Sequence, residues 1–197
     1  MTDGAQQPKR RRGTRRVSAE YLDKAALYYL ERFASSSANL RRVLLRKVAR
    51  SAAAHGTDAA EGERLVDALI ERYLRAGLID DRAYAAQKAA SLRRRGTSRL
   101  GIRGKLALKG VYAELIGDTL ERLDAESSDG ELAAACALVR RRRLGPYREA
   151  GARSQHRQKD LAALARAGFS LAVARRVLSV GDPDALDALA RGAADET

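Results

Sequence analysis

The chain has 197 residues, of which 45% are hydrophobic but only 5% aromatic, and three prolines, which favours helices packed through small aliphatic side chains over any β-sheet. Its net charge of +13 opposes a compact state and predicts an acidic partner, nucleic acid first and an anionic membrane surface second. A single cysteine excludes an intramolecular disulfide and supplies too few ligands for a thiolate zinc site, so we expect a cytoplasmic protein.

The first seventeen residues, 1–17, are predicted to form a disordered basic arm. They hold six Lys or Arg against one Asp and almost no side chains able to build a core. The basic run at 9–12 is not followed by the apolar stretch of a secretory signal, and no later window is long and apolar enough to span a bilayer. We therefore expect no secretory signal and no membrane-spanning segment, and no membrane is included among the expected partners.

Apolar residues at helical spacing predict three helices in 18–79. Ser18 is expected to cap the first, the second to run from about Ser36 to Arg50, and the third to end at Gly77. Residues 51–62 break the pattern between the second and third helices. The side chains expected to face inward are Leu22, Ala26, Tyr29, Leu30, Phe33, Leu40, Val43, Leu44, Val48, Leu65, Val66, Leu69, Ile70, Tyr73 and Leu74.

Three further helices are predicted in 80–126. Asp80 or Asp81 is expected to cap the first of them, and Gly110 separates the second from the third. The side chains expected to face inward are Tyr84, Ala85, Ala89, Leu92, Ile102, Leu106, Leu108, Leu115, Ile116, Leu120 and Leu123.

A third set of three helices is predicted in 127–181. Its first helix turns three side chains inward, those of Leu132, Cys136 and Val139. Its other two helices are expected over about 155–167 and 170–180. The residues that follow, 182–197, hold five acids and one arginine and are predicted to be an acidic tail.

Two of these units are similar in sequence at an offset of 58 residues, which indicates an internal repeat. The matching pairs are Leu106 and Leu164, Gly110 and Gly168, Val111 and Phe169, Leu115 and Val173, and Leu120 and Leu178. The predicted fold class is therefore all-α, as an elongated tandem repeat of three three-helix, helix-turn-helix-like units. These units are expected over 18–79, 80–126 and 127–181.

Each predicted unit carries a cluster of arginines suited to contact with phosphates. Any one of these side chains can be an ordinary solvated arginine, but their recurrence in every unit predicts contact with an acidic macromolecule. The candidates are Arg42, Arg46 and Arg50 in the first unit, Arg93, Arg94, Arg95, Arg99 and Arg103 in the second, and Arg140, Arg141, Arg142 and Arg143 in the third.

No catalytic, metal or cofactor site is predicted. His55 and His156 lack carboxylate or cysteine partners nearby in sequence, and the paired acids Asp80 and Asp81 indicate a helix start rather than metal ligands. Residues 101–105 have two residues between their glycines, where a phosphate-binding loop needs four. Most tyrosines fall on or beside apolar stripes, so they are predicted to pack in the core.

Two stretches resemble motifs of the RecX family. Gly77-Leu78-Ile79-Asp80-Asp81-Arg82-Ala83-Tyr84-Ala85 is similar to the junction of that family's first two repeats, and Leu164-Ala165-Arg166-Ala167-Gly168-Phe169-Ser170 to a turn in its third. The resemblance runs in order from Tyr21 to Val180, although Asn39 and Lys105 stand where the family usually has an acid. It assigns structural roles to Gly77, Leu78, Asp80, Asp81, Tyr84, Gly110, Gly168 and Phe169.

The resemblance implies a regulator of the RecA recombinase with no enzymatic activity of its own. Such a protein binds RecA and its filament on single-stranded DNA and limits strand exchange, ATP hydrolysis and co-protease activity, with effects on DNA repair and the SOS response. The implied partners are RecA, its filament and the DNA phosphates within it, and binding to free DNA stays open. No cofactor is implied, and a monomer is expected.

A helix-turn-helix transcriptional regulator is the alternative from a different class. Helices joined by short Gly or Ser turns can place one helix in the major groove, where Asn, Gln or Arg side chains read bases. Here the basic residues are spread over all three predicted units, which suits phosphate contact better. An adaptor scaffold that binds no nucleic acid is a third alternative, and it leaves these clusters unexplained.

Overall fold

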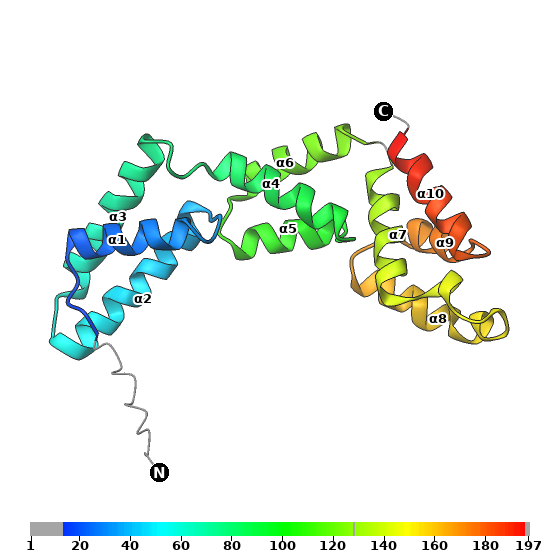
Figure 1. Ribbon diagram of the computed structural model, residues 1–197, viewed down its shortest axis with the longest axis horizontal. Helices are drawn as coiled ribbons and strands as arrows, with labels where there is room; N and C mark the ends of the chain where they lie inside the picture. The colour runs from blue at the N-terminus through cyan, green and yellow to red at the C-terminus, as the bar shows by residue number, and fades with distance from the viewer. Residues whose placement is uncertain (1–13, 128, 196–197) are drawn as a thin grey trace, which may run out of the picture. The chain divides into compact units, whose positions relative to one another are not determined.

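The computed structural model describes residues 14–127 and 129–195, and every regular element in this part of the chain is helical (Figure 1). The prediction of an all-α fold is thereby confirmed for the described residues. The elements are α1 (Ala19–Leu30), α2 (Ser37–His55), α3 (Ala59–Arg75), α4 (Asp81–Arg94), α5 (Arg99–Leu108), α6 (Ala113–Ala125), α7 (Gly130–Arg142), the 3₁₀ turn η1 (Gly145–Tyr147), α8 (Ala150–Arg166), α9 (Leu171–Leu178) and α10 (Pro183–Asp195).

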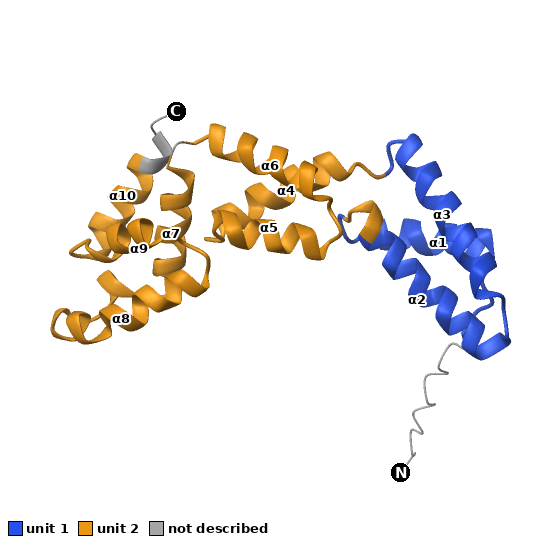
Figure 2. Cartoon of the chain, turned by 180° about the vertical axis from the view of Figure 1, so that it is seen from behind, with its two compact units in different colours: residues 1–34, 39–78 blue, residues 35–38, 79–197 orange. Residues whose placement is uncertain are grey.

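The chain divides into two compact units (Figure 2). Unit 1 comprises residues 1–34 and 39–78 and unit 2 comprises residues 35–38 and 79–197, so α1 and α3 belong to unit 1 and α4 to α10 belong to unit 2. Most of α2 lies in unit 1, and its first residues lie in unit 2. The finer division into three repeated units remains a prediction.

Unit 1 is held together by the apolar faces of α1, α2 and α3. Ser18 caps α1 as predicted, since its hydroxyl accepts a hydrogen bond from the Tyr21 N–H at 3.1 Å. The most deeply buried side chains are those of Leu22, Ala26, Leu40, Leu44, Val48, Val66 and Tyr73. Burial, together with a hydrogen bond that the Tyr73 hydroxyl donates to Asp23 at 2.9 Å, raises the pKa of Tyr73 to about 12.

Several predictions for unit 1 are wrong. Phe33 and Leu74 are 56% and 42% exposed, because α1 ends at Leu30 and Leu74 lies off the buried face of α3. The predicted break at 51–62 is much shorter, since a run of alanines continues α2 to His55 and α3 starts at Ala59. Gly62 lies inside α3, where an added Cβ would overlap the Val48 side chain.

The end of the predicted basic arm is bound to unit 1. The Val17 N–H donates a hydrogen bond to the Ser51 hydroxyl at 2.9 Å, and the Thr14 carbonyl lies 2.7 Å from Nε2 of His55. The prediction of disorder is therefore wrong for 14–17, because backbone groups there find partners on α2. The rest of the arm, 1–13, lies outside the described residues.

In unit 2, α4, α5 and α6 share one hydrophobic cluster built on Leu92, Ile102, Leu106 and Leu115. Asp80 is the residue that caps α4, because its carboxylate accepts hydrogen bonds from the N–H groups of Arg82 and Ala83 at 2.8 and 3.0 Å. The Asp81 carboxylate instead accepts hydrogen bonds from the N–H and hydroxyl of Ser37, at 2.7 and 2.5 Å. Leu108, expected in this core, is 74% exposed, since it closes α5 on the face away from the cluster.

A second hydrophobic cluster of unit 2 joins α7, η1, α8, α9 and α10. Cys136 is 2% exposed within it, which confirms its predicted packing role, and burial raises the pKa of its thiol to about 11. The predicted acidic tail is folded, because α10 buries Leu186 completely in this cluster. The segment was predicted to be a tail because of its acidic residues, although Leu186, Leu189 and Ala190 form an apolar stripe that packs on the cluster.

Two close approaches join the clusters of unit 2 to each other. The Ser98 hydroxyl caps α5 by accepting from the Gly101 N–H and donates to the Ala167 carbonyl at 2.6 Å, between α8 and α9. Gly96, with a φ of +76°, lies directly on α7, where an added Cβ would stand 2.7 Å from the Leu138 nitrogen and 2.9 Å from the Ala134 oxygen. Only a residue without a side chain fits there.

Replacing Gly96 with alanine is therefore expected to lower the free energy of unfolding by about 3 kcal/mol, from backbone strain and overpacking together. Gly104 is the matched control, because it lies within α5 with no atom near its added Cβ. Gly104→Ala should raise stability by about 1 kcal/mol through better helix propensity. Urea denaturation of both variants measures the difference, and equal changes in both would contradict the close contact at Gly96.

Candidate nucleic-acid interface

The first predicted arginine cluster lies on α2 within unit 1. Arg42, Arg46 and Arg50 are exposed, while the buried residues of the same helix, including Leu40 and Leu44, face the core. Nε of Arg50 donates a hydrogen bond to the Arg46 carbonyl at 3.2 Å. The amphipathic pattern of the sequence therefore identified the exposed face correctly.

Arg93, in the second predicted cluster, is not available to a partner. Its side chain is 10% exposed and forms ion pairs with Asp124 on α6 at 2.6 Å and with Glu131 on α7 at 3.2 Å. Burial raises the pKa of Glu131, although the Arg99 N–H and the charge of Arg93 act against that rise. Arg93 is a structural residue that holds α4, α6 and α7 together, so the prediction that it contacts a partner is wrong.

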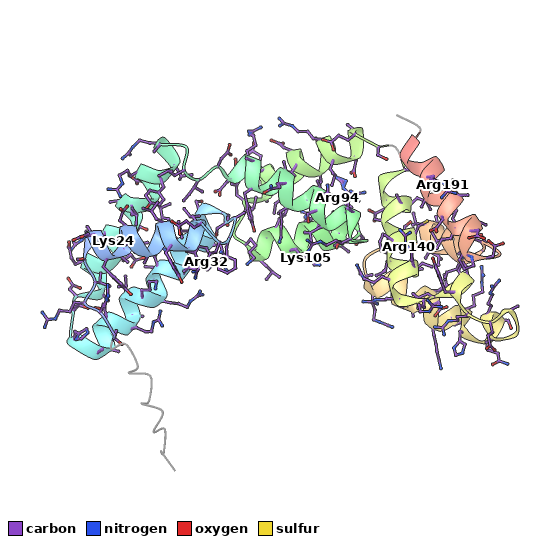
Figure 3. The ribbon with its side chains drawn as sticks, in the orientation of Figure 1. Lys24, Arg32, Arg94, Lys105, Arg140 and Arg191 are labelled. Carbon is purple, nitrogen blue, oxygen red and sulfur yellow. The ribbon has the colours of Figure 1, made fainter. Side chains whose placement is uncertain are left out.

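Four of the remaining candidate arginines of unit 2 come together where α4 and α7 end. The guanidinium of Arg141 donates a hydrogen bond to the Arg95 carbonyl, which brings the end of α7 against the end of α4. Arg94, Arg95 and Arg142 are exposed beside this contact and have no carboxylate partner among residues 14–127 and 129–195. We call the exposed side chains of Arg94, Arg95, Arg141 and Arg142 the helix-end cluster; Figure 3 labels Arg94 on α4 and Arg140 on the neighbouring α7.

Three other predicted candidates of unit 2 interact with side chains of the protein itself. Arg99 pairs with Asp124 at 3.2 Å, and Arg140 pairs with Asp187 of α10 at 3.3 Å. Arg143 adopts a left-handed backbone with a φ of +52°, and its guanidinium lies 5.5 Å from the centre of the Tyr147 ring. Arg103 is exposed on α5. Because the pairs are partly exposed, each contributes little stability and can exchange for a phosphate contact.

The motif residues that carry the family resemblance build turns rather than a binding surface. Gly77, Gly110 and Gly168 have φ values of +69°, +79° and +90°, which only glycine adopts without strain. Tyr84 and Phe169 are buried in the two clusters of unit 2. Leu78 is an exception, because its side chain is 56% exposed.

A basic groove between α1 and α2 of unit 1 was missed by sequence reasoning. Its volume is about 700 Å³, and it is lined by Thr14, Arg15, Ser18, Glu20, Tyr21, Lys24, Ala25, Tyr28, Lys47 and Arg50. Tyr28 is 56% exposed, so it is an exception to the prediction that most tyrosines pack in the core. The spacing of Tyr21, Lys24 and Tyr28 was the available signal, because these residues share one face of α1 opposite to Leu22 and Ala26.

The described residues offer no alternative centre for metal chemistry, since no group of three or more His, Cys, Asp or Glu side chains is placed to hold an ion. Among the same residues no helix has the length and apolar character needed to cross a bilayer. The polar features that remain are the arginines of unit 2 and the basic surface of unit 1.

Comparison with known proteins gives consistent matches. Residues 80–120 match a family model described as "RecX, second three-helix domain". A protein of Myxococcus xanthus (strain DK1622) named "Regulatory protein RecX" is 45% identical over 179 residues, which are 89% of this chain and 95% of that protein. A protein of the same name from Agrobacterium fabrum (strain C58) is 30% identical over 165 residues, 84% of this chain and 85% of that protein. No solved structure matches.

Proposed function

We propose that this chain, which belongs to the RecX family of regulatory proteins, binds the RecA recombinase and its filament on single-stranded DNA and inhibits its activities. The observation that supports contact with such a partner is the helix-end cluster, in which two arginine runs 46 residues apart meet through Arg141 and Arg95. Clustered guanidinium groups bind phosphates and carboxylates in pairs of hydrogen bonds and release counterions from DNA.

The proposed mechanism is steric and conformational, and the protein performs no chemistry of its own. A helical protein bound along a RecA filament excludes a second DNA strand, which limits strand exchange. It also favours an arrangement of RecA subunits that hydrolyses ATP slowly, because a ligand shifts an equilibrium toward the state it binds more tightly. We propose that it acts in this way as a cytoplasmic monomer in DNA repair and the SOS response.

Phosphate contact is favoured over base reading by where the arginines lie. Arg94 and Arg142 are in the last turns of their helices, so they do not form a row of side chains along one exposed helix face. A helix that reads the major groove presents its side chains along one exposed face. The exposed surface of α5 does not suit such a role, because it includes the apolar side chains of Leu100 and Leu108, which are 63% and 74% exposed.

The test is RecA ATP hydrolysis on saturating single-stranded DNA, titrated with the full chain. Saturating DNA removes simple competition for free strand, so inhibition must arise on the filament. We expect inhibition at well below one chain per RecA subunit. No inhibition, together with tight binding to one duplex sequence, would favour the transcriptional regulator instead.

A further inference from the structure

We infer that the groove between α1 and α2 is a binding site for single-stranded nucleic acid, with phosphates on Lys47 and Arg50 and a base stacked on Tyr28. The inference rests on the proposed function in choosing DNA as the polyanion, and it deepens that function by giving the strand a site in unit 1. Neither of the two family motifs described above, 77–85 and 164–170, contributes a residue to this groove.

The charge of the groove selects a polyanion. Four cations line it, Arg15, Lys24, Lys47 and Arg50, against one acid, Glu20, which gives a net charge of +3. Glu20 accepts a hydrogen bond from Lys24 at 2.6 Å, which lowers the pKa of Glu20. Both side chains are more than 70% exposed, so this pair is weak and leaves Lys24 able to turn toward a phosphate.

The aromatic side chains favour a nucleic acid over other polyanions. Tyr21 and Tyr28 are two helical turns apart on α1, with the small Ala25 between them, so their rings border an open stretch about 10 Å long. The Arg32 guanidinium lies over one face of the Tyr28 ring, 3.9 Å from its centre, and Lys47 Nζ lies 5.7 Å from the centre of the Tyr21 ring. Figure 3 labels Lys24 on α1 and Arg32 in the turn that follows it. Unpaired bases stack on such aromatic and guanidinium planes.

The shape of the site favours a single strand. A volume of about 700 Å³ matches the size of a small-ligand pocket, which admits a short stretch of strand. The bases of a duplex are stacked on each other and cannot present a face to Tyr28. An anionic membrane is a broad surface and has no planar ring to place between Tyr21 and Tyr28, so it explains the charge of the groove but not its tyrosines.

The binding test uses a fluorescein-labelled oligothymidylate of about 15 nucleotides, the full chain and no RecA, followed by fluorescence anisotropy. Lys47→Glu with Arg50→Glu should weaken binding at least tenfold and reduce the slope of log K against log salt by about 1.4. The matched control, Arg64→Glu with Arg75→Glu, makes the same charge change on α3 outside the groove and should stay within about twofold of the wild type.

The base-stacking step is tested separately. Tyr28→Ala should weaken binding about tenfold while Tyr28→Phe, which keeps the ring, stays near the wild type. Glu20→Gln should tighten binding about twofold by removing the one acid of the groove.

Three results would overturn the inference: equal loss in the α3 control, no effect of Tyr28→Ala, or tighter binding to phosphatidylglycerol vesicles than to the oligonucleotide. RecA inhibition by the same variants separates the two proposals. If groove variants no longer bind the oligonucleotide but still inhibit RecA, the proposed function holds and the groove is not needed for it. If the wild type binds the oligonucleotide but does not inhibit RecA, the proposed function is contradicted and only the groove as a binding site is supported.

Discussion

Reversing the charge of Arg94, Arg103 and Arg142 together is expected to raise the concentration needed to inhibit RecA ATP hydrolysis by at least about 100-fold. Each loses a charge-assisted contact, which contributes about 1.5–3 kcal/mol, and each factor of ten corresponds to about 1.4 kcal/mol. These three arginines are exposed and have no carboxylate partner in the described chain, so their replacement breaks no internal ion pair. Far-ultraviolet circular dichroism should show unchanged helix content.

The control for this variant reverses Arg166, Arg175 and Arg191, which are exposed on α8, α9 and α10. It changes the net charge by the same amount, so it isolates position from total charge. We expect the concentration needed for inhibition to stay within about threefold of the wild-type value, because charges outside an interface contribute little to affinity. If both variants lost inhibition equally, the helix-end cluster and Arg103 would have no special part in binding.

Replacing Asp160 with alanine is expected to destabilise unit 2 by about 3–5 kcal/mol and to lower its midpoint of thermal unfolding by about 10 °C. The Asp160 carboxylate is buried and accepts hydrogen bonds from Nε and Nη2 of Arg148 at 2.8 and 2.7 Å. It also accepts one from the Gly145 N–H at 2.9 Å. Loss of this carboxylate leaves the Arg148 guanidinium and the Gly145 N–H without their hydrogen-bond acceptor beside the core of α7 to α10. Differential scanning calorimetry measures the change.

The pH dependence of this pair gives an internal check. Burial acts to raise the pKa of Asp160, but the hydrogen bonds from Arg148 and Gly145 outweigh it, so the folded pKa lies below the ordinary value. A carboxyl with a lower pKa in the folded state stabilises the protein fully above about pH 4 and loses that contribution as the pH falls through its folded pKa. The stability difference between wild type and Asp160→Asn should therefore shrink at acid pH. A constant difference would contradict an ionised Asp160.

Helical periodicity and glycine positions predicted most of the fold. The inward stripes of α2, α4, α6 and α7 were correct, and so was that of α5 apart from Leu108, because local spacing determines which side chains share a face. The turns at Gly77, Gly110 and Gly168 were also recognisable, since each needs a positive φ. Leu108 and Phe33 were misplaced for a common reason: both lie at or just beyond a helix end, where the periodic pattern no longer dictates burial.

The candidate site was only partly predictable, because the burial of an arginine and the groups it pairs with depend on the tertiary fold. Nothing in the run 93–95 distinguishes the buried Arg93 from the exposed Arg94, as the acids that pair with Arg93 come from α6 and α7. The meeting of Arg95 with Arg141 likewise depends on Gly96 packing against α7. The groove of unit 1 was hidden by treating tyrosine as a core residue, although Tyr28 faces solvent.

The double role of Ser98 bears on how unit 2 opens. Its hydroxyl is both the N-terminal cap of α5 and the donor to the Ala167 carbonyl, so fraying of α5 and release of the turn between α8 and α9 share one hydrogen-bonded group. Local openings of this kind normally occur independently in separate cooperative segments of a protein. Because these two openings share the Ser98 hydroxyl, we expect a ligand that holds α4 and α5 also to protect the α8–α9 turn against transient unfolding and proteolysis.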